Sequence, residues 1–324
     1  MSLFNLKSAA ATVTGTNTEA AAPFVAALDQ LSTVIVGKRS QLSLALTCLL
    51  ARGHLLIEDL PGVGKTTLAQ ALARTLGLDQ ARVQFTSDLL PADILGVSIY
   101  RREHGDFEFH AGPVFTQLLL ADEINRATPK SQSALLEAME ERQVTVEGNT
   151  RELPDPFFVI ATQNPARQIG TYDLPESQLD RFLMRLELGY PDAAAERELL
   201  LGTDRRYLLK ELAPVMSLDE LRAAQAQVPK VHVAEALVDY LQDLLAYTRR
   251  SAAFEVGLSP RGGIALLRAA QSWAVLAGRN HVIPEDIQSV FGAVVGHRVV
   301  PAGDGERSSA GELGEYLLQQ VPVP

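Results

Sequence analysis

A glycine-rich stretch near residue 60 has the residue types of a phosphate-binding loop. It reads EDLPGVGKTTL over residues 58–68, and the phosphate-loop pattern is glycine, four residues, Gly-Lys, then Ser or Thr. Gly64, Lys65 and Thr66 match this pattern, whereas Asp59 stands where the first glycine is expected. Because aspartate adopts turn conformations readily, we interpret Asp59 as a permitted substitution. Backbone N–H groups of the loop and the positive end of the following helix suit phosphate oxygens.

The loop predicts a nucleotide site that also holds a divalent cation. We expect Lys65 to contact the β- and γ-phosphates and the Thr66 hydroxyl to bind Mg²⁺. The residues expected around the phosphates are Pro61, Gly62, Val63, Gly64, Lys65, Thr66 and Thr67.

Two acidic residues end the apolar run LLLADE. Asp122 and Glu123 follow what reads as a buried strand, and open α/β sheets bind ligands at the carboxyl ends of their strands. We expect Asp122 to hold the hydrated Mg²⁺ and Glu123 to orient or deprotonate an attacking water. An acidic pair can also simply cap a strand, but the phosphate loop upstream favours a chemical role. A small-molecule kinase needs no base for water, so Glu123 favours hydrolysis.

The elements around these residues follow from hydrophobic spacing. HLLIE predicts a strand, KTTLAQALARTLG predicts a helix, and two helices precede them between residues 24 and 53. The runs FTQLLLADE, FFVIATQNP and FLMRLELGYP predict strands of a buried parallel sheet. A helix over PKSQSALLEAMEER and a hairpin turning at Gly148-Asn149 lie between them. We expect a mobile tail over residues 1–22, an α/β nucleotide domain over 23–190 and an all-α domain over 191–324.

Composition narrows the classes of function. The chain of 324 residues has 39 acidic and 29 basic residues, a formal net charge of −10. Nucleic-acid binders usually carry a basic surplus, so this balance disfavours them. Cys48 is the only cysteine and reads as buried core, and the six histidines lack the spacing of zinc ligands. No apolar run is long enough for a membrane span and the N-terminus lacks a secretory pattern, so we expect a cytoplasmic protein.

Several ordered motifs together carry a family resemblance. PGVGKTT, LLLADEINRA, ATQNP and LDRF occur in this order and resemble the ATPase domain of the AAA+ superfamily, the MoxR family in particular. The resemblance extends from about Phe24 to the final VPVP. It implies a P-loop AAA+ domain with a C-terminal helical lid, and ATP and Mg²⁺ as cofactors. Loops of this family often begin with Glu-Asp, which makes Asp59 expected.

The resemblance also implies roles for residues outside the loop. Asn164 in ATQNP would be a sensor that fixes the water beside Glu123. Arg181 in LDRF would be an arginine finger that reaches a neighbouring subunit's ATP, with Arg185 as a less favoured candidate. Arg261 in LSPRGG would be a second sensor, brought by the lid to the γ-phosphate. The residues implied to line the adenine pocket are Ile35, Val36 and Gly37.

Two insertions are expected to be hairpins. The segment from Gly96 to Phe115 alternates polar and apolar residues around His104-Gly105, and the resemblance places it within the second helix of the nucleotide domain. Gln143 to Leu153 resembles a pre-sensor hairpin of the same clade, which includes the magnesium chelatase ATPase subunit. Phe107 and Phe109 share one face of the first hairpin, where they either contact a partner or pack on the sheet beneath.

The resemblance implies a homo-oligomeric ring, expected to be a hexamer, that matures or activates a protein partner. A partner with a von Willebrand factor A (VWA) domain is plausible, because MoxR relatives are commonly associated with such proteins. The alternatives are a chelatase-type metal-insertion motor and a nucleic-acid motor such as a helicase. The acidic balance and the lack of an appended DNA-binding module disfavour the nucleic-acid motor. A small-molecule kinase would not explain Asn164, Arg181 and Arg261 together.

Overall fold

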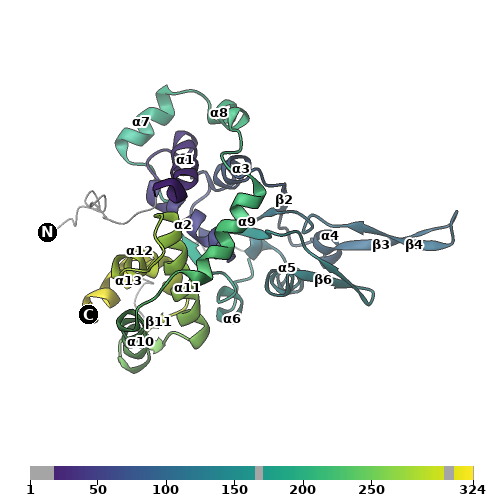
Figure 1. Cartoon of the computed structure of the whole chain (residues 1–324). Helices are drawn as coiled ribbons and strands as arrows, with labels where there is room; N and C mark the ends of the chain where they lie inside the picture. Colours follow the sequence, from purple (N-terminus) through teal and green to yellow (C-terminus); the bar gives the residue numbers. More distant parts are fainter. Residues whose placement is uncertain (1–17, 165–170, 303–309, 324) are drawn as a thin grey trace.

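The computed structural model describes residues 18–164, 171–302 and 310–323 (Figure 1). Most of the expected tail lies outside these residues, but its end does not. Helix α1 (Thr18–Val34) begins before the expected boundary at residue 22, so residues 18–22 are helical. The alanines at 20–22 are the reason, because alanine has the highest helix propensity of all residues. The expected boundary of the tail is therefore wrong for residues 18–22, which extend the first helix.

A five-stranded parallel sheet forms the centre of the molecule, as the sequence predicts. Its order is β2-β5-β8-β1-β9. The strands are β1 (Leu55–Glu58), β2 (Gln80–Gln84), β5 (Leu118–Asp122), β8 (Phe158–Gln163) and β9 (Met184–Leu186). Every strand except β2 was expected from an apolar run. Strand β2 lies at the edge of the sheet and only Val83 within it is buried, so its sequence QARVQ has no such run.

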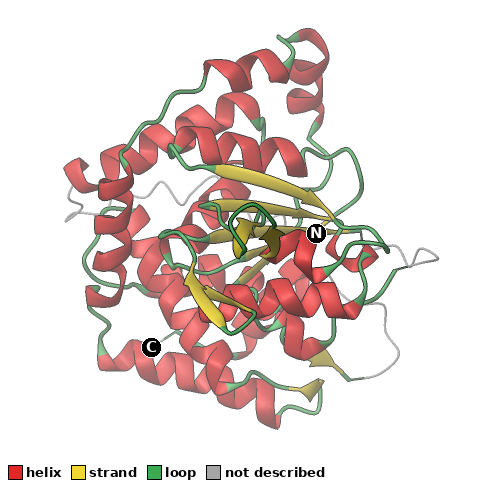
Figure 2. Ribbon diagram, turned by 90° about the vertical axis from the view of Figure 1, so that its right-hand side faces the viewer, coloured by secondary structure: helices red, strands yellow, loops and turns green. Residues whose placement is uncertain are grey.

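Helices cover both faces of the sheet (Figure 2). Alternate strand residues point to opposite faces, and the core divides accordingly. Leu55 and Ile57 of β1 pack in one core with α1, α2 (Arg39–Leu50) and α3 (Lys65–Thr75). Leu56 packs in the other core with α5 (Pro129–Glu141). Cys48 is fully buried in the first core, as expected.

Both expected hairpins are present and extend from the α5 side of the sheet (Figure 1). The first pairs β3 (Gly96–Arg101) with β4 (Asp106–Ala111), directly after the short helix α4 (Pro91–Leu95). The hairpin thus begins directly where this one-turn helix ends. The second pairs β6 (Gln143–Val146) with β7 (Asn149–Glu152). It turns at Glu147-Gly148, one residue earlier than expected, and both residues have the positive φ that a type I′ turn requires.

The C-terminal region is mainly helical. Its helices are α7 (Ala193–Leu201), α8 (Arg205–Glu211), α9 (Leu218–Gln227), α10 (Glu235–Arg250), α11 (Pro260–Leu276), α12 (Pro284–Val295) and α13 (Ala310–Gln320). It is not all-α, because β10 (Phe254–Val256) and β11 (Val300–Pro301) form a small antiparallel sheet. Helix α8 contacts α1 and α3, whereas α11 contacts α2 and α12 contacts β9. The chain therefore passes over α1 and α3 before α11 packs on α2 and α12 packs on β9.

Short elements complete the described chain. They are the 3₁₀ turns η2 (Ile124–Arg126) and η3 (Val228–Lys230) and the one-turn helix α6 (Glu176–Leu179).

Candidate nucleotide site

The glycine loop between β1 and α3 has the backbone that its sequence predicts. Gly62 and Gly64 have φ of 88° and 100°, a left-handed conformation that side chains other than glycine rarely adopt. A Cβ atom at either position would meet open space, so the dihedral angle is what requires glycine. Gly64 is the N-cap of α3, and the positive end of this helix therefore faces the loop.

Asp59 has a structural role at the start of this loop. Its Oδ1 accepts a hydrogen bond from the Leu60 N–H (2.7 Å) and its Oδ2 accepts one from the Gly189 N–H (2.6 Å). The side chain is buried, and its backbone does not need a positive φ. Aspartate in place of glycine therefore causes no strain and joins the loop to the chain after β9.

Lys65 lies at the centre of a hydrogen-bonded cluster. Its Nζ donates to the Asp59 carbonyl (2.6 Å) and to Asn164 Oδ1 (3.0 Å). Burial lowers the pKa of Lys65, while the nearby carboxylates of Asp59, Asp122 and Glu123 raise it part of the way back. The ammonium is thus already desolvated and held by oxygen acceptors.

Asp122 ends β5 with both carboxylate oxygens occupied. Oδ1 accepts from the Thr162 hydroxyl (2.6 Å) and Oδ2 from Arg82 Nη2 (2.7 Å). Sequence reasoning missed both partners. Thr162 could have been found as the first polar residue at the end of the β8 run, since β8 and β5 pair in parallel. Arg82 could not, because β2 itself was not predicted.

Glu123 adopts a left-handed backbone conformation, with φ 57° and ψ 50°. Its N–H donates to the Thr162 hydroxyl (2.9 Å), and its Oε2 accepts from Gln84 Nε2 (2.9 Å). Its Oε2 also pairs with Arg126 (3.2 Å), and Asn164 Nδ2 reaches Oε1 at 3.4 Å. Asn164 therefore bridges Lys65 and Glu123 through the two ends of one amide.

The residues expected to line the adenine pocket lie beside α7. Ile35 is buried, Val36 is half-buried and Gly37 is exposed. A Cβ atom on Gly37 would stand 2.9 Å from that of Ala195, so the start of α7 approaches this turn closely. Lys38 Nζ donates to the Tyr190 carbonyl (2.7 Å). The chain after β9 thus contacts both residues 37–38 and the phosphate loop.

Arg181 and Arg261 lie at the amino ends of the strands, whereas the phosphate loop follows the carboxyl end of β1. Arg181 Nη1 donates to the Leu136 carbonyl (2.9 Å) and pairs with Glu140 Oε2 (3.1 Å), while Arg261 Nη1 pairs with Glu140 Oε1 (3.1 Å). Glu140 follows Met139, whose carbonyl accepts from His54 just before β1. One carboxylate thus holds both guanidinium groups at the amino ends of the strands.

This arrangement separates Arg261 from the phosphate loop of its own chain. Strand β1 has four residues, so the two edges of the sheet are about 13 Å apart at a rise of about 3.3 Å per residue. Arg261 therefore lies at the far end of the strands from the phosphate loop of its own chain. The reason is the path of α7–α9, which carries the last helices to the α2 side. The less favoured finger candidate, Arg185, is mostly buried in β9 and pairs with Glu58 (2.9 Å).

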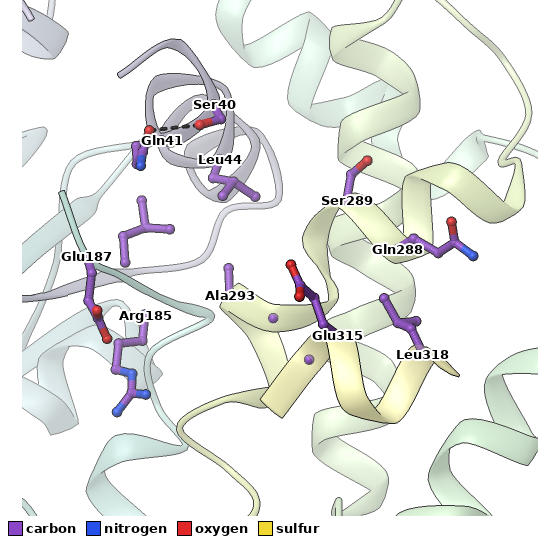
Figure 3. A pocket seen from close by; sticks show the side chains of 13 residues that line it. Ser40, Gln41, Leu44, Arg185, Glu187, Gln288, Ser289, Ala293, Glu315 and Leu318 are labelled. Carbon is purple, nitrogen blue, oxygen red and sulfur yellow. Dashed lines mark hydrogen bonds between the residues drawn. The ribbon is translucent and has the colours of Figure 1, made fainter. Parts of the chain in front are cut away.

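A separate pocket of about 380 Å³ lies between α2, β9, α12 and α13 (Figure 3). None of the loop residues lines it. The side chains of Glu187 and Glu315 are among its walls, and carboxylates repel phosphate groups. The pocket also includes Arg185, and it lies apart from the phosphate loop.

No helix in the described ranges is long and apolar enough to cross a lipid bilayer.

Comparisons with known proteins agree with this geometry. Residues 54–184 match the model described as "ATPase family associated with various cellular activities (AAA)", and residues 246–315 match the AAA lid domain. The chain is 45% identical to the uncharacterized protein YeaC of Bacillus subtilis, over 92% of this chain and 94% of that protein. It is 40% identical to the chaperone MoxR1 of Mycobacterium tuberculosis, over 92% of this chain and 81% of that protein.

A solved structure of a candidate ATPase from Cytophaga hutchinsonii superposes with a TM-score of 0.84 at 36% identity. The superposition covers 94% of this chain and 96% of that one. An ATPase domain, a lid and MoxR-like relatives along nearly the whole chain lead to one assignment. The chain belongs to the MoxR family of AAA+ ATPases.

Proposed function

We propose that this ATPase hydrolyses Mg²⁺-bound ATP as a ring and uses the energy to remodel a protein partner. The observation that carries the proposal is the division of charged groups between the two ends of the parallel strands. We call these ends of the sheet its carboxyl edge and its amino edge. The carboxyl edge has the phosphate loop, Lys65 and the acids, and the amino edge has Arg181 and Arg261 on one carboxylate. Each edge has half of a hydrolysis site, so contact between neighbouring copies would complete it.

The carboxyl edge supports ATP binding and water activation. Lys65 would contact the β- and γ-phosphates, and Glu123 would orient the attacking water, with Asn164 holding both. The Thr66 hydroxyl and the Asp122 carboxylate are the hard oxygen donors that Mg²⁺ prefers. Bound Mg²⁺ would neutralise charge on the phosphates. Because Arg82 pairs with Asp122 in the chain alone, a cation at this place competes with that ion pair.

The amino edge supports action on a neighbour's nucleotide. Arg181 and Arg261 are about a third and a half exposed, and the same carboxylate neutralises both. A γ-phosphate presented by the next subunit would compete with Glu140 for them. We therefore assign both arginines to the neighbouring subunit's site, where Arg261 would reach the γ-phosphate as the expected second sensor. A closed ring, hexameric by the family resemblance, gives each site such a neighbour.

The first hairpin supports a protein partner. Phe107 is 68% exposed and its ring packs at a tilt against the exposed Tyr100, with ring centroids 5.2 Å apart. Exposed aromatic rings are strong anchors in protein interfaces. The related MoxR1 is named a chaperone, and we extend this role to the present chain. A VWA-domain protein is the partner that the family resemblance favours, and a chelatase-type motor is the nearest alternative.

One experiment tests this function as a whole. Purified Glu123→Gln chain, which should bind ATP without hydrolysing it, is incubated with native cell extract and the retained proteins are identified. ATP-dependent assembly and ATP-dependent retention of the same protein are expected. The control is the double variant Glu123→Gln with Lys65→Ala, which should retain nothing. Stimulation of the wild-type ATPase by DNA, with no protein retained, would instead favour a nucleic-acid motor.

A further inference from the structure

Arg298, a residue of the lid, forms several hydrogen bonds with the segment that contains Arg181. Arg298 follows α12, and its side chain is only 4% exposed. Its Nε donates to Asp180 Oδ1 (2.7 Å), Nη2 donates to the carbonyls of Asp180 (3.2 Å) and Phe182 (2.7 Å), and Nη1 donates to the Leu183 carbonyl (3.0 Å). Nη1 also donates to the carbonyl of Val294, in the last turn of α12. All five N–H donors of the guanidinium are thus used.

These bonds fix the backbone on both sides of Arg181. The Asp180 and Phe182 carbonyls flank Arg181 directly, and both accept from Arg298. The neighbouring His297 adds a second donor, because its Nε2 lies 3.0 Å from the Phe182 carbonyl. The N–H groups of Arg181 and Phe182 bond within the local turn, to Gln178 and Leu179. In the part of the lid that the structure describes, residues 297 and 298 are the donors to the carbonyl side of this turn.

A buried guanidinium is a costly way to join two surfaces. Desolvation lowers the pKa of Arg298, and the Asp180 carboxylate opposes this shift. Apolar residues of similar volume would join such surfaces at least as stably in many proteins. An arginine differs from apolar residues because its planar guanidinium donates in fixed directions, and it thereby orients the peptide groups that accept from it.

A chain of contacts then leads from Arg298 to both exposed arginines. Asp180 accepts from Arg298 through Oδ1, and its Oδ2 lies 3.8 Å from Arg261 Nε. Arg261 in turn shares Glu140 with Arg181. Lid residues therefore set the position of the whole cluster.

We propose that Arg298 is a positioning residue for Arg181, so that the lid of one subunit determines how well its finger serves the next subunit's ATP. This inference rests on the proposed function, because it requires Arg181 to act on a neighbour. Arg298 is not among the residues proposed to bind the nucleotide. Its effect reaches hydrolysis only through the segment 180–183.

The proposal is tested with Arg298→Met, which keeps an unbranched apolar stem and removes every donor. A misplacement of about 1 Å costs on the order of 10²-fold in rate, so kcat should fall by about that factor. The dissociation constant of a fluorescent ADP analogue should change less than about twofold, since the carboxyl edge is untouched. Arg298→Lys keeps the charge but has no planar fork, so it should recover only part of the lost rate.

Mixed rings separate positioning from a merely structural role. Arg298→Met subunits have an intact phosphate loop, and Lys65→Ala subunits have an intact finger. Mixing them should therefore restore activity, as mixing Arg181→Ala with Lys65→Ala should. If only the Arg181→Ala mixture recovers, Arg298 acts within its own subunit and the proposal is overturned. If neither mixture recovers in rings shown to be mixed, the proposed function of Arg181 itself has failed.

Asp180→Asn gives a second test if Arg298→Met does not fold. Asp180 is partly exposed and keeps its shape as asparagine, but the charge that holds Arg298 is gone. A folded Asp180→Asn ring should lose kcat by about tenfold, retain nucleotide affinity and recover in the same mixture. Unchanged kcat in this variant would overturn the proposal.

Discussion

The two edges of the central sheet differ in how they are built. At the carboxyl edge, Glu123 and Asn164 directly follow strands and Lys65 ends the loop that follows β1. The longest bond among these three residues is 3.4 Å. At the amino edge, Arg181, Arg261 and Glu140 come from three separate segments and are held together by the lid. The first edge is fixed by local chain geometry, whereas the second depends on how two domains pack. Changes at the carboxyl edge should therefore act within a subunit, and changes at the amino edge should act on its neighbour.

The largest effect should come from Arg181. Arg181→Ala should lower ATP hydrolysis by about 10³- to 10⁵-fold, as the loss of an arginine finger does, and nucleotide affinity should stay near normal. Steady-state hydrolysis and fluorescent nucleotide titration measure the two quantities. Arg185→Ala is the control, and it should not give this pattern because Arg185 is mostly buried against Glu58. A near-normal rate for Arg181→Ala would remove the distinction between the edges.

Glu123→Gln should act within its own subunit. Loss of a general base costs about 10² to 10⁴ in rate, while ATP should stay bound because the amide keeps the volume of the carboxylate. Lys65→Ala should instead weaken ATP binding itself. Single-turnover hydrolysis and filter binding distinguish these outcomes, and rapid turnover by Glu123→Gln would exclude the water-activating role.

Acid should weaken the fold at the amino edge. Burial lowers the pKa of His54 from 6.5 to about 4, and it lowers that of His297 as well. Between pH 6.5 and 4 the unfolded chain binds a proton that folded His54 does not, so the free energy of unfolding should fall by about 3 kcal/mol from this group.

Urea unfolding at pH 7 and pH 4.5 measures this loss. His54→Gln should reduce the pH dependence, because glutamine does not titrate. His104→Gln, at an exposed position, should leave it unchanged. Equal pH dependence in both variants would contradict the assignment.

The two phenylalanines of the first hairpin should behave differently. Phe109 is half-buried against Phe115 and beneath the Arg151 guanidinium, so Phe109→Ala should cost about 1–2 kcal/mol, less than for a fully buried ring. Phe107→Ala should leave the melting temperature and basal hydrolysis unchanged and should remove stimulation by the partner. A melting temperature lowered equally by both changes would mean that Phe107 packs as Phe109 does.

The smallest effect should come from Arg82. Arg82→Gln frees Asp122 from a half-exposed ion pair, and such pairs contribute about 0.2–1 kcal/mol. The Mg²⁺ concentration for half-maximal nucleotide binding should therefore fall by up to about fivefold. A titration with fluorescent ADP at increasing Mg²⁺ measures the shift, and an increased requirement would show that Arg82 supports the cation site.

The sequence predicts the carboxyl edge far better than the amino edge. The phosphate loop, the strands β1, β5 and β8, and the two acids at the end of β5 all depend on short contiguous patterns. Strand β2 was missed because an edge strand with one buried residue has no apolar run, and its side chains Arg82 and Gln84 were missed with it.

The position of Arg261 could not be predicted from local pattern. Its motif, LSPRGG, correctly indicates the start of a helix, α11. Where that helix packs depends on contacts of α7–α9 with α1, α2 and α3, which join residues more than a hundred positions apart. No single segment of the sequence carries a pattern that predicts such long-range contacts.

The stacking of Arg151 on Phe109 has a mechanical consequence. The guanidinium carbon lies 3.8 Å from the ring centroid, so the second hairpin braces the first one part of the way along its length. A hairpin that is supported along its length bends less when a force acts on its tip. The brace itself begins directly after α5, whose last turn contains Glu140. A force on Phe107 would thus be transmitted both to the root of the first hairpin and to α5, whose Glu140 pairs with the two arginines. Arg151→Ala should remove this support, and faster hydrogen exchange along β4 would measure the loss.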